Sequence, residues 1–291
     1  MPELPEVETV RRGLQTYIIG KTIHSVFHDT EKSFPNAKVD VKQFLIGATI
    51  TSIERRAKLL IINLSSDYSL LVHLKMTGQL VYAGQTPDVH FGAGHPNDSL
   101  IHALPDKSTR VTLVFDDNTQ LFFNDQRKFG WMRLLPTIEV PNIDFMQKVG
   151  PEPLSKEFTS DEFIQRFQRR SRTTIKAALL DQSVIAGVGN IYADESLWGA
   201  KIHPKRLVGN VTDEELEVLY HELRSVMNLA IKMGGSSSRN YVTVEGKRGS
   251  YLQFARVFRR EGLLCPRCGT VVEKLRVAGR GTHICPSCQQ Q

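Results

Sequence analysis

Cysteine is scarce in this 291-residue chain, and the only four lie close to its C-terminal end. Because nothing before them can be joined by a disulfide, the chain is not a disulfide-stapled scaffold. Long apolar runs are also missing, since no segment approaches the roughly 20 residues of a membrane-spanning helix. The acidic start, Met1–Glu6, lacks the apolar stretch of a secretory signal. We therefore expect a cytoplasmic, nucleoid-associated protein with no membrane partner.

A strong charge bias is absent from most of the chain. The whole sequence has 37 Lys and Arg against 31 Asp and Glu, a net charge of +6. From Arg239 to the end there are ten basic and three acidic residues, so this stretch alone carries +7 and the remainder −1. A local basic excess suits a segment that contacts phosphates, so we expect nucleic acid to bind at the C-terminal end.

The first half of the chain has the pattern of one helix followed by strands. Apolar residues recur on one face from Glu3 to Ile18, and Pro5 suits a first helical turn. Six runs are typical of β-strands: 22–27, 49–53, 59–64, 69–74, 111–115 and 120–123. Asp116–Asn118 predicts a hairpin turn between the last two. The polar stretch Gly84–Ser108 is interpreted as a long surface loop with solvated histidines.

Four prolines between Pro136 and Pro153 mark a domain boundary. Beyond it four segments have helical composition: 161–170, 175–181, 193–198 and 213–233, the last capped by Thr212 or Asp213. The predicted fold class is α+β, with a β-sandwich and leading helix before a helical region. The expected division is an N-terminal domain at 1–135, a linker at 136–152, a helical domain at 153–238 and a C-terminal part at 239–291.

The cysteines form the pattern C-x2-C, sixteen residues, C-x2-C, and are Cys265, Cys268, Cys285 and Cys288. This spacing is typical of a four-thiolate zinc site, and Thr270–Ile284 is long enough for a β-hairpin between the pairs. A closed site with four cysteines leaves no position for substrate, so we expect one structural Zn²⁺. We expect the hairpin to hold Arg276 and Arg280 against DNA. Zinc ribbons also serve protein–protein contacts, so the motif alone does not establish DNA binding.

The N-terminus offers a candidate nucleophile, since removal of Met1 would expose the secondary amine of Pro2. An α-amino group has a pKa of about 7.7–8.0, so a useful fraction is neutral near pH 7. Attack on a sugar C1′ would expel a base and leave an iminium, with Glu3 as acid or base. In the alternative interpretation Pro2 is an ordinary start residue and Glu3–Glu6 merely favour a helix N-terminus.

The opening block, Pro2–Gly13, resembles the N-terminal signature of the formamidopyrimidine-DNA glycosylase family. Further blocks match that family in the same order: Arg55–Lys58, His73–Gly78, Asn124–Gly130, Gly150–Leu154, Thr174–Lys176, Gly187–Ala193 and His203–Pro204, before the zinc module. The resemblance spans essentially the whole chain. It implies a β-sandwich, a helix–two-turn–helix domain and a zinc-finger hairpin. It also implies a base-excision repair enzyme that removes oxidised purines, 8-oxoguanine and formamidopyrimidines, and then cleaves the abasic site by β,δ-elimination.

By the same resemblance four residues carry the chemistry. Pro2 is the Schiff-base nucleophile, Glu3 the acid/base, Lys58 assists β-elimination and contacts a phosphate, and Arg280 assists δ-elimination. Without the resemblance, Lys58 would be interpreted as a solvated lysine at a strand end.

The resemblance also implies a set of contacts to damaged double-stranded DNA. His73, Asn190 and Arg280 grip phosphates around the lesion, although Asn190 in a glycine-rich turn is also a candidate helix N-cap. Met76, Arg127 and Phe129 fill the space that the extruded base leaves, and Arg127 faces the orphaned cytosine. Without the resemblance, Met76 and Phe129 would be interpreted as ordinary core residues.

Three departures from the family pattern stand out. A histidine is usual near Lys107–Arg110, so Arg110 is expected to make the DNA contact there instead. Gly84–Ser108 is longer than usual, and Gly246–Gly249 reads Gly-Lys-Arg-Gly in place of Gly-Lys-Pro-Gly. That last segment follows Tyr241 and the loop 234–240, which correspond to the part that covers the flipped base.

Two rival interpretations remain. The endonuclease VIII branch of the same superfamily prefers oxidised pyrimidines, but it usually carries glycine where this chain has Leu4. A non-catalytic, zinc-stabilised DNA-binding protein would be favoured if Met1 were retained, because a blocked Pro2 cannot form an iminium. We expect a monomer that binds bent DNA in a cleft between its two domains.

Overall fold

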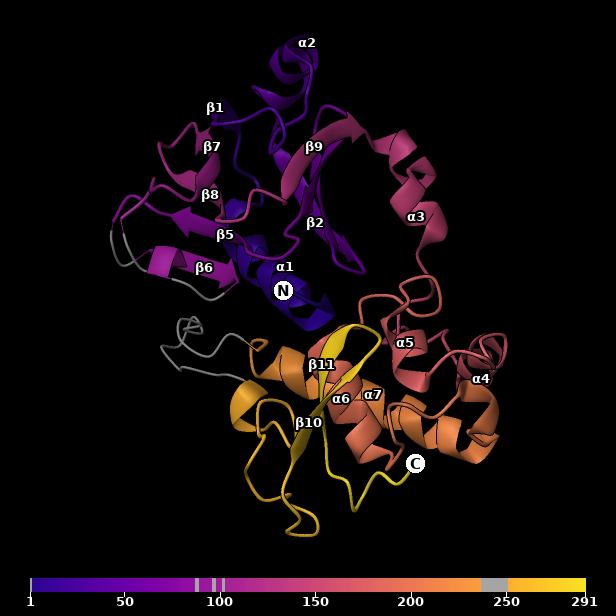
Figure 1. The fold of residues 1–291 in the computed structure, drawn as a ribbon. Coiled ribbons are helices and arrows are strands. Elements are labelled where there is room, and N and C mark those ends of the chain that lie inside the picture. The colour runs from indigo at the N-terminus through magenta and orange to yellow at the C-terminus, as the bar shows by residue number, and fades with distance from the viewer. Residues whose placement is uncertain (1, 87–88, 96–97, 101–102, 237–250) are drawn as a thin grey trace. The chain divides into compact units, whose positions relative to one another are not determined.

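The computed structural model describes residues 2–86, 89–95, 98–100, 103–236 and 251–291 (Figure 1). These residues form two compact units. Among them, the first unit takes in the described residues from 2 to 147 together with 234–236, and the second takes in 148–233 and 251–291. The division after Gln147 falls within the predicted linker, although that stretch is partly helical, with η3 (Thr137–Asn142) and α3 (Asp144–Lys148). The predicted domain limits remain a prediction.

The first unit consists of α1 (Leu4–Ile18), two antiparallel sheets and short helical turns. The five-stranded sheet has the order β1 (Ile23–His28), β7 (Thr109–Phe115), β8 (Gln120–Asp125), β5 (Gly78–Ala83) and β6 (His90–Gly94). The four-stranded sheet has the order β2 (Ile50–Arg56), β3 (Leu59–Leu64), β4 (Tyr68–His73) and β9 (Trp131–Pro136). The short turns are α2 (Lys38–Asp40), the π-helical η1 (Val41–Leu45) and η2 (Asp98–Leu100). The predicted sandwich with a leading helix is confirmed, as are all six predicted strands.

The core of this unit is made by one face of α1 and the inner faces of both sheets. Fully buried apolar residues come from the helix and from each sheet, among them Val10, Leu14, Leu60, Val72 and Leu113. Each such side chain contributes about 1.5–3 kcal/mol when it leaves water.

The prediction of a surface loop at Gly84–Ser108 was wrong. The stretch contains β6, which pairs with β5, and it buries Phe91 and Leu100. Phe91 packs so closely on α1 that a Cβ added at Gly13 would lie 1.9 Å from its ring. Two of the five residues of β6 are glycine, so the sequence lacked the apolar alternation that identifies a strand.

The second unit is helical and ends in a hairpin. Its helices are α4 (Ser160–Gln168), α5 (Ile175–Leu180), α6 (Asn190–Gly199) and α7 (Asp213–Lys232), with 3-10 turns η4 (Val208–Asn210) and η5 (Tyr251–Gln253). The hairpin, β10 (Glu273–Val277) and β11 (Arg280–Ile284), packs on α6 (Figure 1). Thr212 caps α7 in a capping box with Glu215, which confirms one of the two predicted caps. Among the described residues, no helix combines the length and apolar character needed to cross a membrane.

Candidate functional site

The predicted nucleophile lies directly before α1, where Pro2 and Glu3 are both buried. Glu3 is the N-cap residue of the helix, and its backbone N–H donates to Glu6 Oε2 at 2.8 Å. Glu3 and Glu6 thus stabilise the helix N-terminus, which is the structural part of the alternative interpretation. Both roles are compatible, because the cap fixes the backbone from which Pro2 projects.

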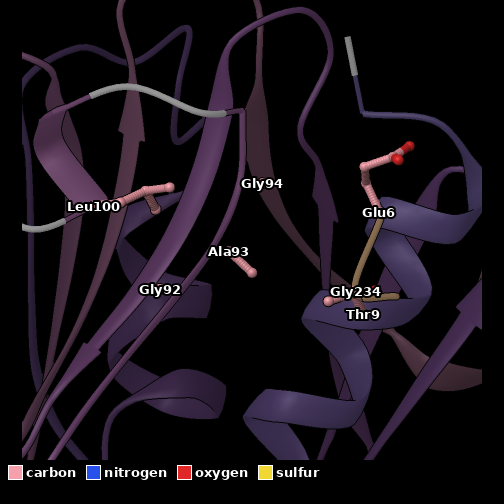
Figure 2. A pocket seen from close by; sticks show the side chains of 7 residues that line it. All are labelled: Glu6, Thr9, Gly92, Ala93, Gly94, Leu100 and Gly234. Carbon is pink, nitrogen blue, oxygen red and sulfur yellow. The ribbon is translucent and has the colours of Figure 1, made fainter. Parts of the chain in front are cut away.

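Glu6 also anchors the segment that follows α7. Its Oε1 accepts a hydrogen bond from the Ser236 N–H at 2.8 Å. Gly235 has a φ of 84°, and a Cβ there would lie 3.1 Å from the Glu6 side chain. Figure 2 shows Glu6 and Thr9 on α1 near Gly234, facing a narrow pocket whose other wall is β6 and Leu100. The beginning of the predicted lesion-covering loop is thus attached to α1, the helix that follows the predicted nucleophile.

Glu8 joins α1 to β2 and shapes the turn that carries Lys58. It accepts hydrogen bonds from Arg11, Arg12 and Arg55. Burial raises the pKa of Glu8, but bonds from Arg11 and Arg12 and nearby positive charge lower the pKa to about 2. Arg55 also donates to the Ala57 carbonyl at 3.0 Å, where Ala57 has a φ of 52°.

Lys58 is buried, with only 8% of its surface exposed, so the interpretation as a solvated strand-end lysine is wrong. It immediately precedes Leu59, whose partner across the β3–β4 ladder is His73. The predicted catalytic lysine and the predicted phosphate ligand therefore lie at the same end of one sheet.

His73 is held in one protonation state. Burial, and then the charges of Lys75 and Lys58, lower the pKa of His73 to about 3, so the ring is neutral near pH 7. Its Nδ1 accepts a hydrogen bond from the Lys75 N–H at 3.0 Å, which places the ring proton on Nε2. His73 can thus offer an uncharged N–H donor to a phosphate.

Met76, Arg127 and Phe129 are the residues predicted to fill the space of the extruded base, and we call them the wedge residues. They lie on two connections between the sheets. The first, Leu74–Thr77, joins β4 to β5 and carries Met76, and the second, Gln126–Gly130, joins β8 to β9. We call them the two crossovers. They run side by side, because β4 pairs with β9 at His73 and Trp131, and β5 pairs with β8 at Gly78 and Asp125.

The second crossover presents an aromatic ring and a cation to solvent. Phe129 is 43% exposed, and the Arg127 guanidinium lies 4.9 Å from the centre of its ring. Phe129 is therefore not a core residue, while Met76 is partly buried. A large exposed aromatic beside an arginine suits a wedge between stacked bases.

Arg110 does not face solvent in the way that a DNA contact requires, because only 5% of its surface is exposed. Its Nε donates to the Asp125 carbonyl at 2.8 Å, its Nη1 pairs with Asp29, and its Nη2 donates to the Lys107 carbonyl. A DNA contact by Arg110 stays a prediction, and these bonds argue for a structural role instead. Ser108 is likewise buried, in a turn capped by Asp106.

In the second unit, Asn190 and Arg280 lie close together. Asn190 Nδ2 donates to the carbonyl of Gly281 at 2.9 Å, and Gly281 follows Arg280 directly. Asn190 is the first residue of α6 rather than its N-cap, which is Gly189, so that alternative was wrong. Arg280 is exposed beside the two-residue turn of the hairpin, where Ala278 has a φ of 50°.

The sequence interpretation assigned no role to Lys176, although it identified the block Thr174–Lys176. Lys176 is fully buried and pairs with Asp194 Oδ1 at 2.5 Å and with Thr282 Oγ1 at 2.6 Å. Asp194 also accepts from the backbone N–H of His283 at 3.0 Å. This network fixes β11, and hence Arg280, on α6. A buried lysine has no sequence signal beyond a charge inside an apolar helix.

The four cysteines converge at one end of the hairpin, with all sulfurs within 4.8 Å of one another. Three of the sulfur pairs are 3.4, 3.5 and 4.0 Å apart. A tetrahedral zinc with Zn–S bonds of about 2.3 Å needs sulfurs about 3.8 Å apart, so the residues fit the ion. Trp198 Nε1 donates to Cys265 Sγ at 3.4 Å, which ties the site to α6.

Several predictions concern residues outside the described part of the chain. They are Met1, His102, Tyr241, most of the loop 234–240, and Gly246–Gly249.

Three family models match the chain in succession. They describe the formamidopyrimidine-DNA glycosylase N-terminal domain at residues 1–132, the H2TH domain of the same enzymes at 149–242, and a zinc finger found in FPG and IleRS at 262–291. Curated relatives match over the full length. A formamidopyrimidine-DNA glycosylase of Desulforamulus reducens is 40% identical, covering 100% of this chain and 99% of its own, and one of Halalkalibacterium halodurans is 41% identical, covering 100% of both.

Solved structures agree with this result. A complex between a Lactococcus lactis FPG variant and a Fapy-dG containing DNA superposes with a TM-score of 0.87 at 37% identity, covering 100% of both chains. A complex of the Lactococcus lactis enzyme with an abasic site containing DNA gives 0.86 at 37% identity, covering 99% of this chain and 100% of that one.

Proposed function

The chain belongs to the formamidopyrimidine-DNA glycosylase family, and from that premise we propose how its own residues carry out the reaction. It is a base-excision repair enzyme, a DNA glycosylase with AP lyase activity. Pro2 is the nucleophile once Met1 has been removed. The observation that carries the proposal is the place of Pro2, buried directly before the capped N-terminus of α1 and next to Glu3.

The reaction runs through a covalent intermediate. The Pro2 nitrogen forms a bond to the sugar C1′, the bond from C1′ to the base breaks, and the base leaves with a proton supplied by Glu3. The Pro2 nitrogen then loses its proton, and the C1′–O4′ bond breaks as O4′ takes up a proton, which opens the sugar ring and leaves an iminium between Pro2 and C1′. This iminium acidifies the 2′ hydrogens. Loss of one of them, assisted by Lys58, expels the 3′ phosphate, and a second elimination, assisted by Arg280, expels the 5′ phosphate.

DNA is held by donors from both units. His73 offers a neutral Nε2–H to a phosphate, whereas Arg280 offers a charge and Asn190 an amide N–H. Only the charged contact releases a counterion, so Arg280 adds to the salt dependence of binding and His73 does not. Met76, Arg127 and Phe129 occupy the space of the extruded base, with Arg127 facing the opposite cytosine.

The substrate class that these residues serve is the oxidised purine, 8-oxoguanine as well as formamidopyrimidines. Leu4 supports this assignment over the pyrimidine-preferring branch. We further propose that the protein acts as a monomer, because one chain supplies every residue named above.

Borohydride trapping tests the proposal on a duplex with 8-oxoguanine opposite cytosine. The wild-type protein should form a covalent adduct that maps to Pro2, and Pro2→Gly should lose most of it. A thymine-glycol duplex run in parallel should trap less. Stronger trapping on thymine glycol would move the preference to oxidised pyrimidines. Protein free of Met1 that binds DNA but forms no adduct would refute the Pro2 mechanism.

A further inference from the structure

A single buried carboxylate, Asp125, connects the two crossovers that carry the wedge residues. Asp125 is fully buried at the last position of β8. Its Oδ1 accepts a hydrogen bond from the Thr77 hydroxyl and one from the Arg127 N–H at 3.1 Å. Its Oδ2 accepts from the N–H groups of Phe129 at 2.8 Å and Gly130 at 2.7 Å. Oδ1 is thus bonded to both crossovers, and Oδ2 is bonded to the second crossover.

Thr77 completes the link between the crossovers. Its hydroxyl donates to Asp125 and also accepts from the Arg127 N–H at 3.1 Å. Because Thr77 directly follows Met76, the same pair of side chains fixes the backbone next to Met76 and the backbone of Arg127. The geometry of the three wedge residues therefore depends on two neighbouring polar side chains.

The position of Asp125 is also fixed by hydrogen bonds to its backbone and by close packing. The Asp125 backbone N–H donates to the Ser108 carbonyl at 2.8 Å, and its carbonyl accepts from the buried Arg110 Nε at 2.8 Å. The space around it is full, since a Cβ added at Gly130 would lie 2.6 Å from Phe123 and 3.2 Å from Asp125 Oδ2. Asp125 cannot shift to suit a different loop conformation without disturbing the sheet.

We propose that Asp125 is a positioning residue that presents Met76, Arg127 and Phe129 as one preformed wedge, an inference that rests on the proposed function of those three residues. Hydrogen bonds to the buried carboxylate order the backbone before DNA arrives, so the loops lose little freedom on binding. In Asp125→Asn an NH₂ group replaces one oxygen and faces backbone N–H donors, which cannot bond to it. We expect the two crossovers in this variant to lose their link or to adopt a different backbone conformation.

The test compares Asp125→Asn with the wild-type protein and with Asp117→Asn. Asp117 is the matched control, because it caps the turn at the opposite end of the β7–β8 pair by accepting from the Thr119 N–H and hydroxyl. It supports none of the wedge residues. Three readouts are needed: single-turnover excision of 8-oxoguanine opposite cytosine and opposite adenine, 2-aminopurine fluorescence beside the lesion, and borohydride trapping on a single-stranded abasic oligonucleotide.

We expect Asp125→Asn to lower the single-turnover excision rate on duplex DNA about tenfold to a hundredfold. A loss of this size is typical when contacting groups are misplaced by about 1 Å. The cytosine-over-adenine preference should flatten and the 2-aminopurine signal of unstacking should diminish. Trapping on the single strand needs no wedge and should be retained. Asp117→Asn should match the wild type in all three readouts.

Two Thr77 variants keep the inference testable if Asp125→Asn does not fold. Thr77→Ser retains the hydroxyl and should behave as the wild type, while Thr77→Val should shift the opposite-base preference in the same direction as Asp125→Asn.

An Asp125→Asn protein, or Thr77→Val in its place, that keeps both the opposite-base preference and the fluorescence signal would overturn the inference. If the wild-type protein traps normally, that outcome leaves the proposed function intact. A wild-type protein that neither excises nor traps would overturn the proposed function, and the inference with it.

Discussion

The two regions that we expect to contact DNA are fixed by different physical means. In the first unit, the crossovers that carry Arg127 and Phe129 are held by hydrogen bonds to one buried carboxylate, Asp125. In the second unit, the hairpin that carries Arg280 is held at its cysteine end by the zinc site and along β11 by the buried Lys176–Asp194 pair.

The difference follows from what each region can bury. The crossovers grow out of a sandwich with a large apolar core, so a local carboxylate is enough to order them. The hairpin has two short strands and a small cluster around Trp198, Cys265 and Cys285, and an isolated hairpin of this kind is marginally stable in water. It therefore needs a metal and a buried ion pair. We expect a perturbation of either support to change the stability of one region while leaving the other largely unaffected.

Removal of zinc should have the largest effect. A structural Zn²⁺ contributes on the order of 10–16 kcal/mol to folding of its module, so a chelator or Cys265→Ser should unfold the hairpin and abolish DNA binding. The fluorescence of Trp131, in a Trp198→Phe background, should still report a cooperative unfolding transition for the first unit. Loss of that transition together with the zinc would show that the two regions are not independent.

Breaking the buried ion pair should come next. Lys176→Met leaves Asp194 without its ammonium partner, and removing one member of a buried pair costs about 3–5 kcal/mol. Denaturant unfolding of the second unit should report this loss, and DNA binding should weaken because Arg280 is displaced. Lys274→Met removes the exposed pair with Glu261, so it serves as the control and should cost under about 1 kcal/mol.

The pH dependence of the first unit should show a smaller effect, which arises from His73. Its pKa is lowered from 6.5 to about 3 by burial and by Lys75 and Lys58. Above pH 6.5 the ring is neutral in both the folded and the unfolded state, so it contributes no pH dependence. As the pH falls below 6.5 the unfolded state takes up a proton that the folded state does not, and stability decreases.

A His73→Asn variant should therefore have a flatter profile of unfolding free energy between pH 6.5 and pH 4 than the wild type. Equal slopes would mean that His73 is protonated in the folded protein. In that case its phosphate contact would be an ion pair.

The smallest effect should come from the hydrogen bond to the zinc site. Trp198→Phe keeps most of the packing but removes the N–H that donates to Cys265 Sγ. Loss of such an outer partner should weaken zinc retention about tenfold, measured as the rate of metal transfer to a chromogenic chelator. Unchanged release would assign Trp198 to packing alone, including its stacking under Arg267.

Local patterns in the sequence were sufficient for much of the fold. The helix at residues 3–18, the hairpin around Asp116–Asn118 and the zinc spacing were all readable, because each depends on neighbours within a few residues. The strands β5, β6 and β9 were missed, since glycines and a terminal proline weaken their alternation and long-range pairing determines them.

The candidate site divides in the same way. The order of residues was enough to define the available chemistry: an N-terminal proline, a glutamate beside it, a lysine in the Arg55–Lys58 block and four thiolates. The folded chain was needed to learn that the Arg110 guanidinium is bonded within its own domain and that the pKa of His73 is lowered. It was also needed to learn that Asp125 and Lys176 hold the two regions that we expect to contact DNA. The reason is physical, because burial and the partners of a polar group depend on residues far apart in the chain.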